Sequence, residues 1–345
     1  MVDDKNKRKH DILIVAVDEY IKSAQPITSG GLNQHFKNIS SATIRNELNA
    51  LESMGYFRQV HTSGGRVPTS LAYKEYVNSV VLSGKLKADN IKQVVSDYEE
   101  RSVSLMSTLS TLAKRLSRAT NCPAVLVQHG LKNLTIENIQ IIPLINKDAL
   151  LLVETNAGVI DESMTLDPNI ERSACVEAGD YLTKHFKSKT IEYMIDNISD
   201  VCFKAGAQMV QFRELIQNVA NSLISVIKTR YDVTNENPTK LLDGLNQSEI
   251  DETKEMFEFL QDEDSVIDVI NKDSEDINFV IGDDNDDRLK GGMMLSAPIV
   301  INGVPIASLA LVGPKRIDYQ QVASALKFIV GQIDNLKGDN SVKTR

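Results

Sequence analysis

The 345-residue sequence has no tryptophan, only 5% aromatic residues and three cysteines. Its cores must therefore depend on Ile, Leu and Val. Cys122, Cys175 and Cys202 lie far apart without CxxC spacing, a pattern typical of reduced cysteines in a reducing compartment. No apolar run approaches the roughly 18 residues that span a bilayer, and Asp18 and Glu19 interrupt the apolar stretch near the N-terminus, so no secretion signal is expected. These absences indicate a cytoplasmic protein without a membrane partner.

Motifs that carry catalysis or metal binding are also missing. No GxxxxGK[ST], GxGxxG or GxSxG occurs, so neither a phosphate cradle nor a nucleophile elbow is expected. The five histidines show no HxH or HExxH spacing. Asp283, Asn285 and Asp287 alternate as in a calcium loop, but Arg288 stands where that loop needs Gly, and Met294 where it needs Glu. We therefore expect no enzyme, metal or cofactor, and a solvated acidic loop over 283–287.

Charge is distributed unevenly along the chain. The sequence holds 38 Lys and Arg against 47 Asp and Glu, a net charge of −9. Residues 1–80 contain ten basic and eight acidic residues and carry +2, so the remaining 265 residues carry −11. A charge of +2 is far below that of a strongly basic nucleic-acid-binding domain. The placement of the charges, rather than their sum, has to indicate such a function.

The first 70 residues predict three helices followed by a hairpin. A helix over 8–23 has one apolar face, and Thr28 or Ser29 can cap a short second helix that ends near residue 36. A third helix starts at Ser40 or Ser41 and ends at Gly55. Strands over 56–60 and 66–68 flank the turn HTSGG. The expected core positions are Ile12, Val15, Ala16, Tyr20, Ile44, Leu48, Leu51 and Met54.

The third helix has the polar face of a helix that reads the major groove. Arg can donate to two acceptors on guanine, and Asn can form a donor–acceptor pair with adenine. Hydroxyls at the helix N-terminus can contact phosphate, and paired glycines allow the hairpin a tight turn with positive φ. Alone, such a hairpin is more often a plain surface feature, but after three helices it favours DNA binding. The candidate DNA-binding residues are Ser40, Ser41, Thr43, Arg45, Asn46, Asn49, His61, Thr62, Ser63, Gly64, Gly65 and Arg66.

Beyond residue 80 the pattern changes from helix to strands, back to helix, and then to strands. The helical stretch 88–119 repeats apolar residues every seven positions and is either an ordinary amphipathic helix or a dimer seam. Strand patterns fill 123–166 and 292–313, the second with an Asn302-Gly303 hairpin signal. Helical periodicity covers 169–270, and a final helix covers 319–336. This order predicts an α+β domain that is interrupted by a helical insertion.

Several stretches resemble the HrcA family of heat-inducible transcription repressors of bacterial chaperone operons. SSATIRNELNALESMGYFRQVHTSGGRVPTSLAYKEYV (40–77) is similar to the family's N-terminal signature, and YIKSAQPITSGGL (20–32) to the segment before it. LLDGLNQSEI (241–250) and 281–322, especially GPKRIDY (313–319), resemble later family segments. Gly30-Gly31 departs from the basic residue usual there, and Gly65 is preceded by Gly where the family often has Ala. The matches run in family order along nearly the whole chain.

The resemblance implies an α+β multidomain fold. It consists of a winged helix-turn-helix domain at 1–80, a GAF-like α+β domain at 88–168 plus 276–338 that includes the long leading helix, and an inserted helical dimerisation domain at 169–275. It further implies a homodimeric repressor that binds an inverted-repeat operator in double-stranded DNA upstream of chaperone (GroE/DnaK-type) operons and is released on heat shock. The expected partners are therefore DNA, a second copy and a GroEL-type chaperonin.

Two alternatives stay open. A ligand-sensing winged-helix regulator would use the GAF-like domain as a metabolite pocket, and thermal-shift screening with metabolites would reveal it. A structural nucleoid protein would bind all DNA alike, so its ratio of specific to random affinity would be near one.

Overall fold

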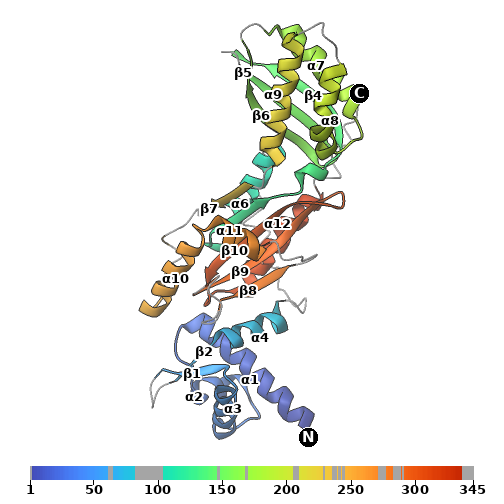
Figure 1. Ribbon diagram of the computed structural model, residues 1–345. Helices are drawn as coiled ribbons and strands as arrows, with labels where there is room; N and C mark the ends of the chain where they lie inside the picture. Colours follow the sequence, from blue (N-terminus) through green and yellow to red (C-terminus); the bar gives the residue numbers. More distant parts are fainter. Residues whose placement is uncertain are drawn as a thin grey trace.

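The computed structural model describes residues 2–60, 65–81, 104–145, 148–167, 170–204, 210–227, 230–234, 239, 242, 245–270, 277–282, 289 and 291–335. Figure 1 shows three units in a row: a winged-helix domain at the N-terminus, a central body around a five-stranded sheet, and an insert with its own three-stranded sheet at the far end. Within the described residues, no helix has the length and hydropathy of a membrane span.

The winged-helix domain contains the three predicted helices and the hairpin. Thr28 caps α2 and Ser40 caps α3, and Gly55 ends α3 with φ +84°. Met54, an expected core position, is instead 53% exposed because it lies at the C-terminal cap of α3, past the buried stripe. Helix α4, whose buried face includes Tyr73 and Val77, was not predicted. The elements are α1 (Val2–Ser23), α2 (Ser29–Leu32), η1 (Asn33–His35), α3 (Ser41–Ser53), β1 (Phe57–Gln59), β2 (Arg66–Pro68) and α4 (Ser70–Val80).

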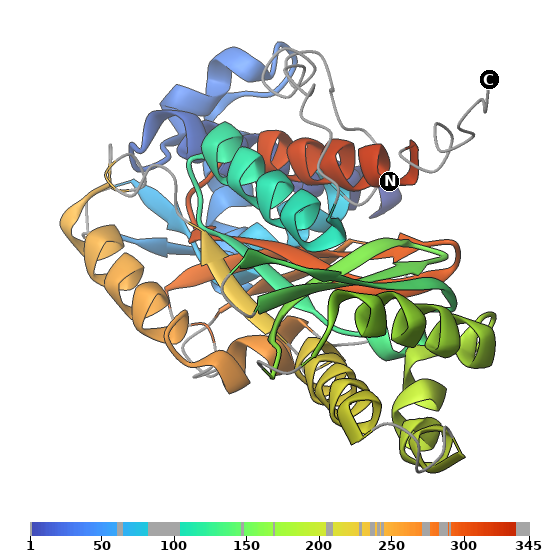
Figure 2. The ribbon, with the colours of Figure 1, turned by 90° about the horizontal axis from the view of Figure 1, so that it is seen from above.

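The body is an antiparallel sheet in the order β7-β3-β10-β9-β8. Figure 2 shows α6 and α12 side by side on one face of this sheet and α10 on the other. The predicted Asn302-Gly303 hairpin between β9 and β10 is confirmed, with positive φ at both residues. The body comprises α6 (Leu105–Thr120), β3 (Ala124–Gln128), β7 (Arg230–Thr234), α10 (Gln247–Phe259), α11 (Glu263–Ile270), β8 (Asn278–Ile281), β9 (Gly292–Ile301), β10 (Val304–Pro314) and α12 (Tyr319–Asn335).

The insert corrects the expected division of the chain. Strands β4, β5 and β6 form a separate sheet and do not join β9 and β10. Helices α7 and α9 pack on this sheet, and α8 packs on α9. The insertion is therefore not helical alone: it leaves the body after β3 and returns at β7, which pairs with β3. Periodicity identifies a strand but not its partner. The insert comprises η2 (Leu131–Asn133), β4 (Ile136–Pro143), β5 (Asp148–Thr155), β6 (Gly158–Thr165), α7 (Arg172–Phe186), α8 (Ile191–Lys204) and α9 (Val210–Ile227).

Two predictions fall partly or wholly outside the described residues. Of the helical stretch 88–119, the structure describes only the part from residue 104 onward, where α6 buries Leu105, Leu109, Leu112 and Leu116. The acidic loop 283–287 lies outside the described residues. The helix is therefore confirmed over Leu105–Thr120, whereas the rest of the stretch and the acidic loop stay predictions.

Helix α4 joins the winged-helix domain to the body. Tyr319 of α12 packs its ring against Tyr73 and Tyr76 of α4 and Phe279 of β8, with centroid distances of 5.6–6.2 Å. Ser70 Oγ donates to the Gly282 carbonyl at 2.9 Å. Burial raises the pKa of Tyr319 well above its ordinary value, so its phenol stays neutral in this apolar junction.

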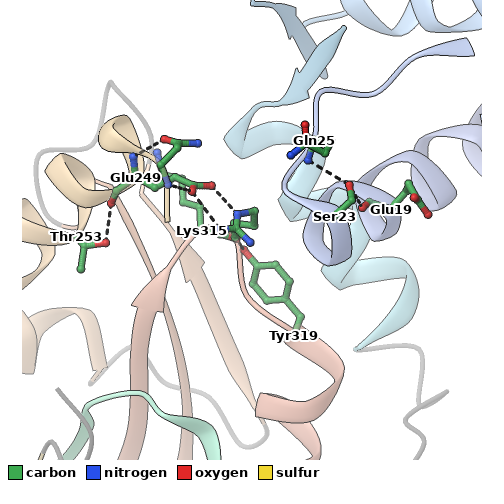
Figure 3. A network of polar contacts seen from close by, with 9 residues as sticks. Glu19, Ser23, Gln25, Glu249, Thr253, Lys315 and Tyr319 are labelled. Atoms are coloured by element: carbon green, nitrogen blue, oxygen red, sulfur yellow. Dashed lines mark hydrogen bonds and ion pairs between the residues drawn. The ribbon is translucent and has the colours of Figure 1, made fainter. Parts of the chain in front are cut away.

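A polar network lies beside the same junction. Arg316 Nε donates to Glu249 Oε1 at 2.7 Å, and the two side chains are each only 12% exposed. Glu249 also closes the capping box of α10 with Asn246. Figure 3 shows Glu249 and its partners as one group of polar contacts and, on the other side of the view, a second group formed by Glu19, Ser23 and Gln25 at and just after the end of α1. The GPKRIDY segment (313–319) therefore connects the end of β10 to the start of α12 and contacts α10 through Arg316.

Candidate nucleic-acid interface

Helix α3 has one buried and one exposed face. Ile44, Leu48 and Leu51 are buried against the rest of the domain, as predicted, whereas Arg45, Asn46 and Asn49 are exposed. Figure 1 places α3 at the end of the molecule that is farthest from the insert. A helix with a free polar face at the tip of a molecule has the form required to enter a major groove about 12 Å wide.

The N-terminus of α3 is organised by its own cap. Ser40 Oγ accepts a hydrogen bond from the Thr43 amide at 3.1 Å and lies 2.9 Å from Thr43 Oγ1. Ser41 Oγ donates to Ser29 Oγ at 3.4 Å, which brings the first turns of α3 and α2 together. Ser40 and Ser41 are exposed and Thr43 is half-buried. These three residues therefore form one polar corner at the start of the helix.

Two arginines hold α3 from different elements. Arg8 of α1 donates to Glu47 Oε1 through Nε at 3.2 Å and Nη2 at 2.7 Å, and Glu47 is buried. Arg66 of β2 donates to Glu52 Oε2 through Nε at 2.8 Å and to Asn49 Oδ1 through Nη2. Both acidic partners lie on α3. Bidentate or paired guanidinium contacts of this kind fix direction as well as distance, so the rotation of α3 is set from two sides.

The wing is a short antiparallel pair, β1 and β2, extended by a bridge from Arg66 to Ile27. Gly65 was expected to have positive φ, but its φ lies outside that region. Its glycine is required by close approach instead: a Cβ there would lie 2.7 Å from the backbone of Pro26. His61, Thr62, Ser63 and Gly64 lie outside the described residues, so their predicted contacts stay predictions.

Arg66 differs most from expectation. As a candidate DNA-binding residue Arg66 was expected to donate to phosphate or the minor groove, but it is only 9% exposed and its guanidinium contacts Glu52 and Asn49. The sequence shows that Arg66 follows the turn, but the strand register decides that its side chain faces α3. In this structure Arg66 connects the wing to α3 rather than facing solvent.

Arg58 is a candidate that the sequence interpretation missed. It is exposed in the middle of β1, next to buried Phe57. The alternation of Phe57 and Arg58 in the strand YFRQV could have identified it, since successive side chains of a strand point to opposite faces. The Arg8–Glu47 pair had no such signal, because 39 residues separate its members.

Nothing among the described side chains suggests catalysis or metal binding. No cluster of three or more His, Cys, Asp or Glu residues occurs within the described ranges. Cys122 is buried, and burial raises the pKa of its thiol to about 12, so it is not a nucleophilic thiolate near neutral pH. His129, half-buried in the body, bonds to Ser308 Oγ at 2.9 Å. These groups belong to the core.

Comparison with known protein families gives a match for the N-terminal domain and another for most of the remaining chain. The model for the "HrcA protein C terminal domain" matches residues 106–323. The model for "Winged helix-turn-helix transcription repressor, HrcA DNA-binding" matches residues 6–80, the domain that presents α3. The first model alone covers more than half of the chain. The family resemblance seen in the sequence is therefore confirmed.

Individual relatives agree over almost the full length. The heat-inducible transcription repressor HrcA of Ruminiclostridium cellulolyticum is 26% identical over 335 residues, which is 95% of this chain and 96% of the relative. That of Clostridioides difficile is 28% identical over 333 residues, 94% and 97% of the two chains. A crystal structure of a hypothetical protein aligns with TM-score 0.67 and 22% identity over 95% of this chain and 97% of that one, which supports the fold.

The polar face of α3, the wing beside it and the two family matches lead to one assignment. The chain belongs to the HrcA family of heat-inducible transcription repressors, and it is a repressor with a winged-helix DNA-binding domain rather than an enzyme.

Proposed function

We propose that this chain is a homodimeric repressor that binds an inverted-repeat operator upstream of chaperone operons of the GroE/DnaK type. One α3 enters the major groove of each half-site, and the twofold symmetry of the dimer sets the half-site spacing to whole helical turns. The observation that carries this proposal is the exposed pair Arg45 and Asn46 on a helix whose opposite face is buried. Arg45 and Asn46 read base edges.

The remaining contacts of the proposal position the protein on the backbone. Ser40, Ser41 and Thr43 meet a phosphate at the N-terminus of α3, where amide groups favour an anion. Arg58 supplies a phosphate contact from β1. His61, Thr62 and Ser63 supply donors to phosphate or the minor groove, and Gly64 and Gly65 let the wing backbone come close to the duplex. Such contacts fix the register of the protein on DNA and contribute most of the salt dependence of binding.

Release on heating follows from low stability. Protein domains are stable by only about 5–15 kcal/mol, and a fold that depends on association is more sensitive still. We propose that heating moves the repressor toward unfolded forms, while other unfolded proteins occupy the GroEL-type chaperonin that restores it. Active repressor then falls and the operons are transcribed. The proposed location is the cytoplasm, where operator and chaperonin are both present.

Operator binding by α3 variants tests the proposal. Arg45→Ala and Asn46→Ala should each weaken binding to the operator by about 1–3 kcal/mol and relax base preference, because a bidentate base contact is lost. Fluorescence anisotropy with an operator duplex and a scrambled duplex measures both effects. Arg172→Ala, exposed in the insert, and Asn78→Ala, exposed on α4, are the matched controls and should bind normally.

Several outcomes would contradict parts of the proposal. Unchanged operator binding in both α3 variants would show that α3 is not the reader. Equal affinity for operator and scrambled duplexes would favour a nucleoid protein. No gain in active fraction when chaperonin is titrated into the assay would contradict the chaperonin dependence. A metabolite that raises Tm and changes operator affinity would favour the ligand-sensing regulator.

A further inference from the structure

A polar triad is formed by Arg66, Glu52 and Asn49. The DNA contacts proposed above give it no role. Arg66 lies in β2, whereas Asn49 and Glu52 lie on α3, three residues apart and therefore on neighbouring positions of the helix surface. Arg66 is almost fully buried, whereas Asn49 is exposed on the same face as Arg45 and Asn46. The triad therefore connects a buried arginine to the surface that is offered to DNA.

The guanidinium of Arg66 is held in one orientation. On both sides its backbone is paired, with Gln59 in β1 and with Ile27, whose amide donates to the Arg66 carbonyl at 2.7 Å. Its Nε donates to Glu52 at 2.8 Å. Because a guanidinium is planar, fixing Nε also fixes the direction of Nη2, and Nη2 donates to Asn49 Oδ1.

This contact decides which end of the Asn49 carboxamide faces the wing. Arg has five N–H donors and no acceptor, so only the oxygen of an amide can face it. A flipped amide would place Nδ2 donors against Nη2 donors and lose the hydrogen bond. Asn49 Oδ1 is therefore directed toward Arg66, and the Nδ2 amino group is the part of the amide that Arg66 does not engage.

We propose that Arg66 is a positioning residue that orients Asn49, so that Asn49 reads DNA as a hydrogen-bond donor. It would recognise an acceptor on a base edge, such as guanine O6 or N7 or thymine O4, instead of forming the donor–acceptor pair with adenine that a free Asn makes. This proposal rests on the proposed function, since it requires α3 in the major groove.

Selection from a randomised operator library by the full chain tests the proposal. Asn49→Asp replaces the Nδ2 donor with an acceptor at an exposed position, where folding is not at risk. It should lower affinity for the selected site about tenfold, the effect of a lost hydrogen bond, and shift preference at one base pair toward cytosine, whose N4 is a donor. Arg66→Met and Arg66→Lys should relax preference at that same base pair, and adding either to Asn49→Ala should change it no further.

The salt dependence of binding separates this role from a direct contact of Arg66 with phosphate. An arginine that neutralises one phosphate contributes a slope of about −0.9 to log affinity against log salt. The Arg66 variants should keep the wild-type slope, whereas the matched control Arg58→Met, exposed on the partner strand, should lower its magnitude and keep base preference.

The proposal is overturned if Arg66→Lys and Arg66→Met lower the slope and leave base preference intact, or if Asn49→Asp retains the wild-type preference. Thermal melting checks that each variant is folded, and Asn49→Asp decides the question even if the Arg66 variants are unfolded. If the wild-type chain selects no consensus, or if the Arg45 and Asn46 variants also have no effect, the proposed function itself has failed.

Discussion

The winged-helix domain and the body both use arginine–glutamate pairs, but they bury them differently. In the body, the Arg316 and Glu249 side chains are each 12% exposed. In the winged-helix domain one partner is always more accessible: the exposures are 10% for Arg66 with 30% for Glu52, and 36% for Arg8 with 6% for Glu47.

The difference follows from where the pairs act. Arg316 and Glu249 join two segments of the body, the GPKRIDY segment and α10. Arg8 and Arg66 each contact an acidic residue on α3, a helix whose outer face is free. Pairs beside an exposed helix face can orient side chains for a ligand, whereas a pair in which both side chains are largely buried mainly stabilises the fold. Substitutions in the two regions should therefore change different properties.

The largest expected effect is on the stability of the body. Arg316→Ala should lower the free energy of unfolding by about 3–5 kcal/mol, because it leaves the carboxylate of Glu249 buried without its partner. Base preference of the folded fraction should not change. Urea unfolding measures the first effect and operator selection the second. Arg172→Ala, at an exposed arginine of the insert, is the control. A loss of unfolding free energy below about 1 kcal/mol would show that solvent screens this ion pair as it screens exposed pairs.

A smaller effect is expected at the buried face of α3. Glu47→Gln should cost about 1 kcal/mol of stability, since the partly exposed Arg8 can be solvated when its ion pair is lost. Operator affinity should fall as well, because Arg8 no longer holds α3 firmly. Thermal unfolding and anisotropy measure the two changes. Glu75→Gln, whose partner His10 is exposed like itself, is the control and should change neither. Reduced stability with unchanged operator affinity would show that the pair does not position α3.

The smallest effect is a pH dependence confined to the body. Burial lowers the pKa of His129 from its ordinary 6.5, so the folded state binds this proton less readily than the unfolded state. The resulting contribution to stability is complete above pH 6.5 and is lost as the pH falls below 6.5 toward the folded pKa. His129→Gln should remove this part of the acid sensitivity in urea unfolding. At pH 8, where His129 is neutral in both the folded and unfolded states, it should not contribute to any pH dependence of stability. Identical dependences of unfolding free energy on pH in the wild-type chain and His129→Gln would contradict this prediction.

Local signals predicted the winged-helix domain well. The cap at Ser40, the buried positions Ile44, Leu48 and Leu51, and the glycine at 55 all depend on residues within a few positions of one another. The same signals found the Asn302-Gly303 hairpin in the body. They failed for β7 and β8, which are short strands of five and four residues, and for the sheet that β4–β6 form.

The sequence by itself determined the first three helices of the winged-helix domain, the polar face of α3 and the family, because turn chemistry and helical period are encoded locally. Only the tertiary structure decided that β4–β6 form a sheet separate from the body sheet, that position 65 must be glycine because it packs against the Pro26 backbone, and that Arg66 faces Asn49 and Glu52 instead of solvent. Each of these depends on segments brought together by folding. A pattern within one strand cannot show which distant side chain its residues will meet.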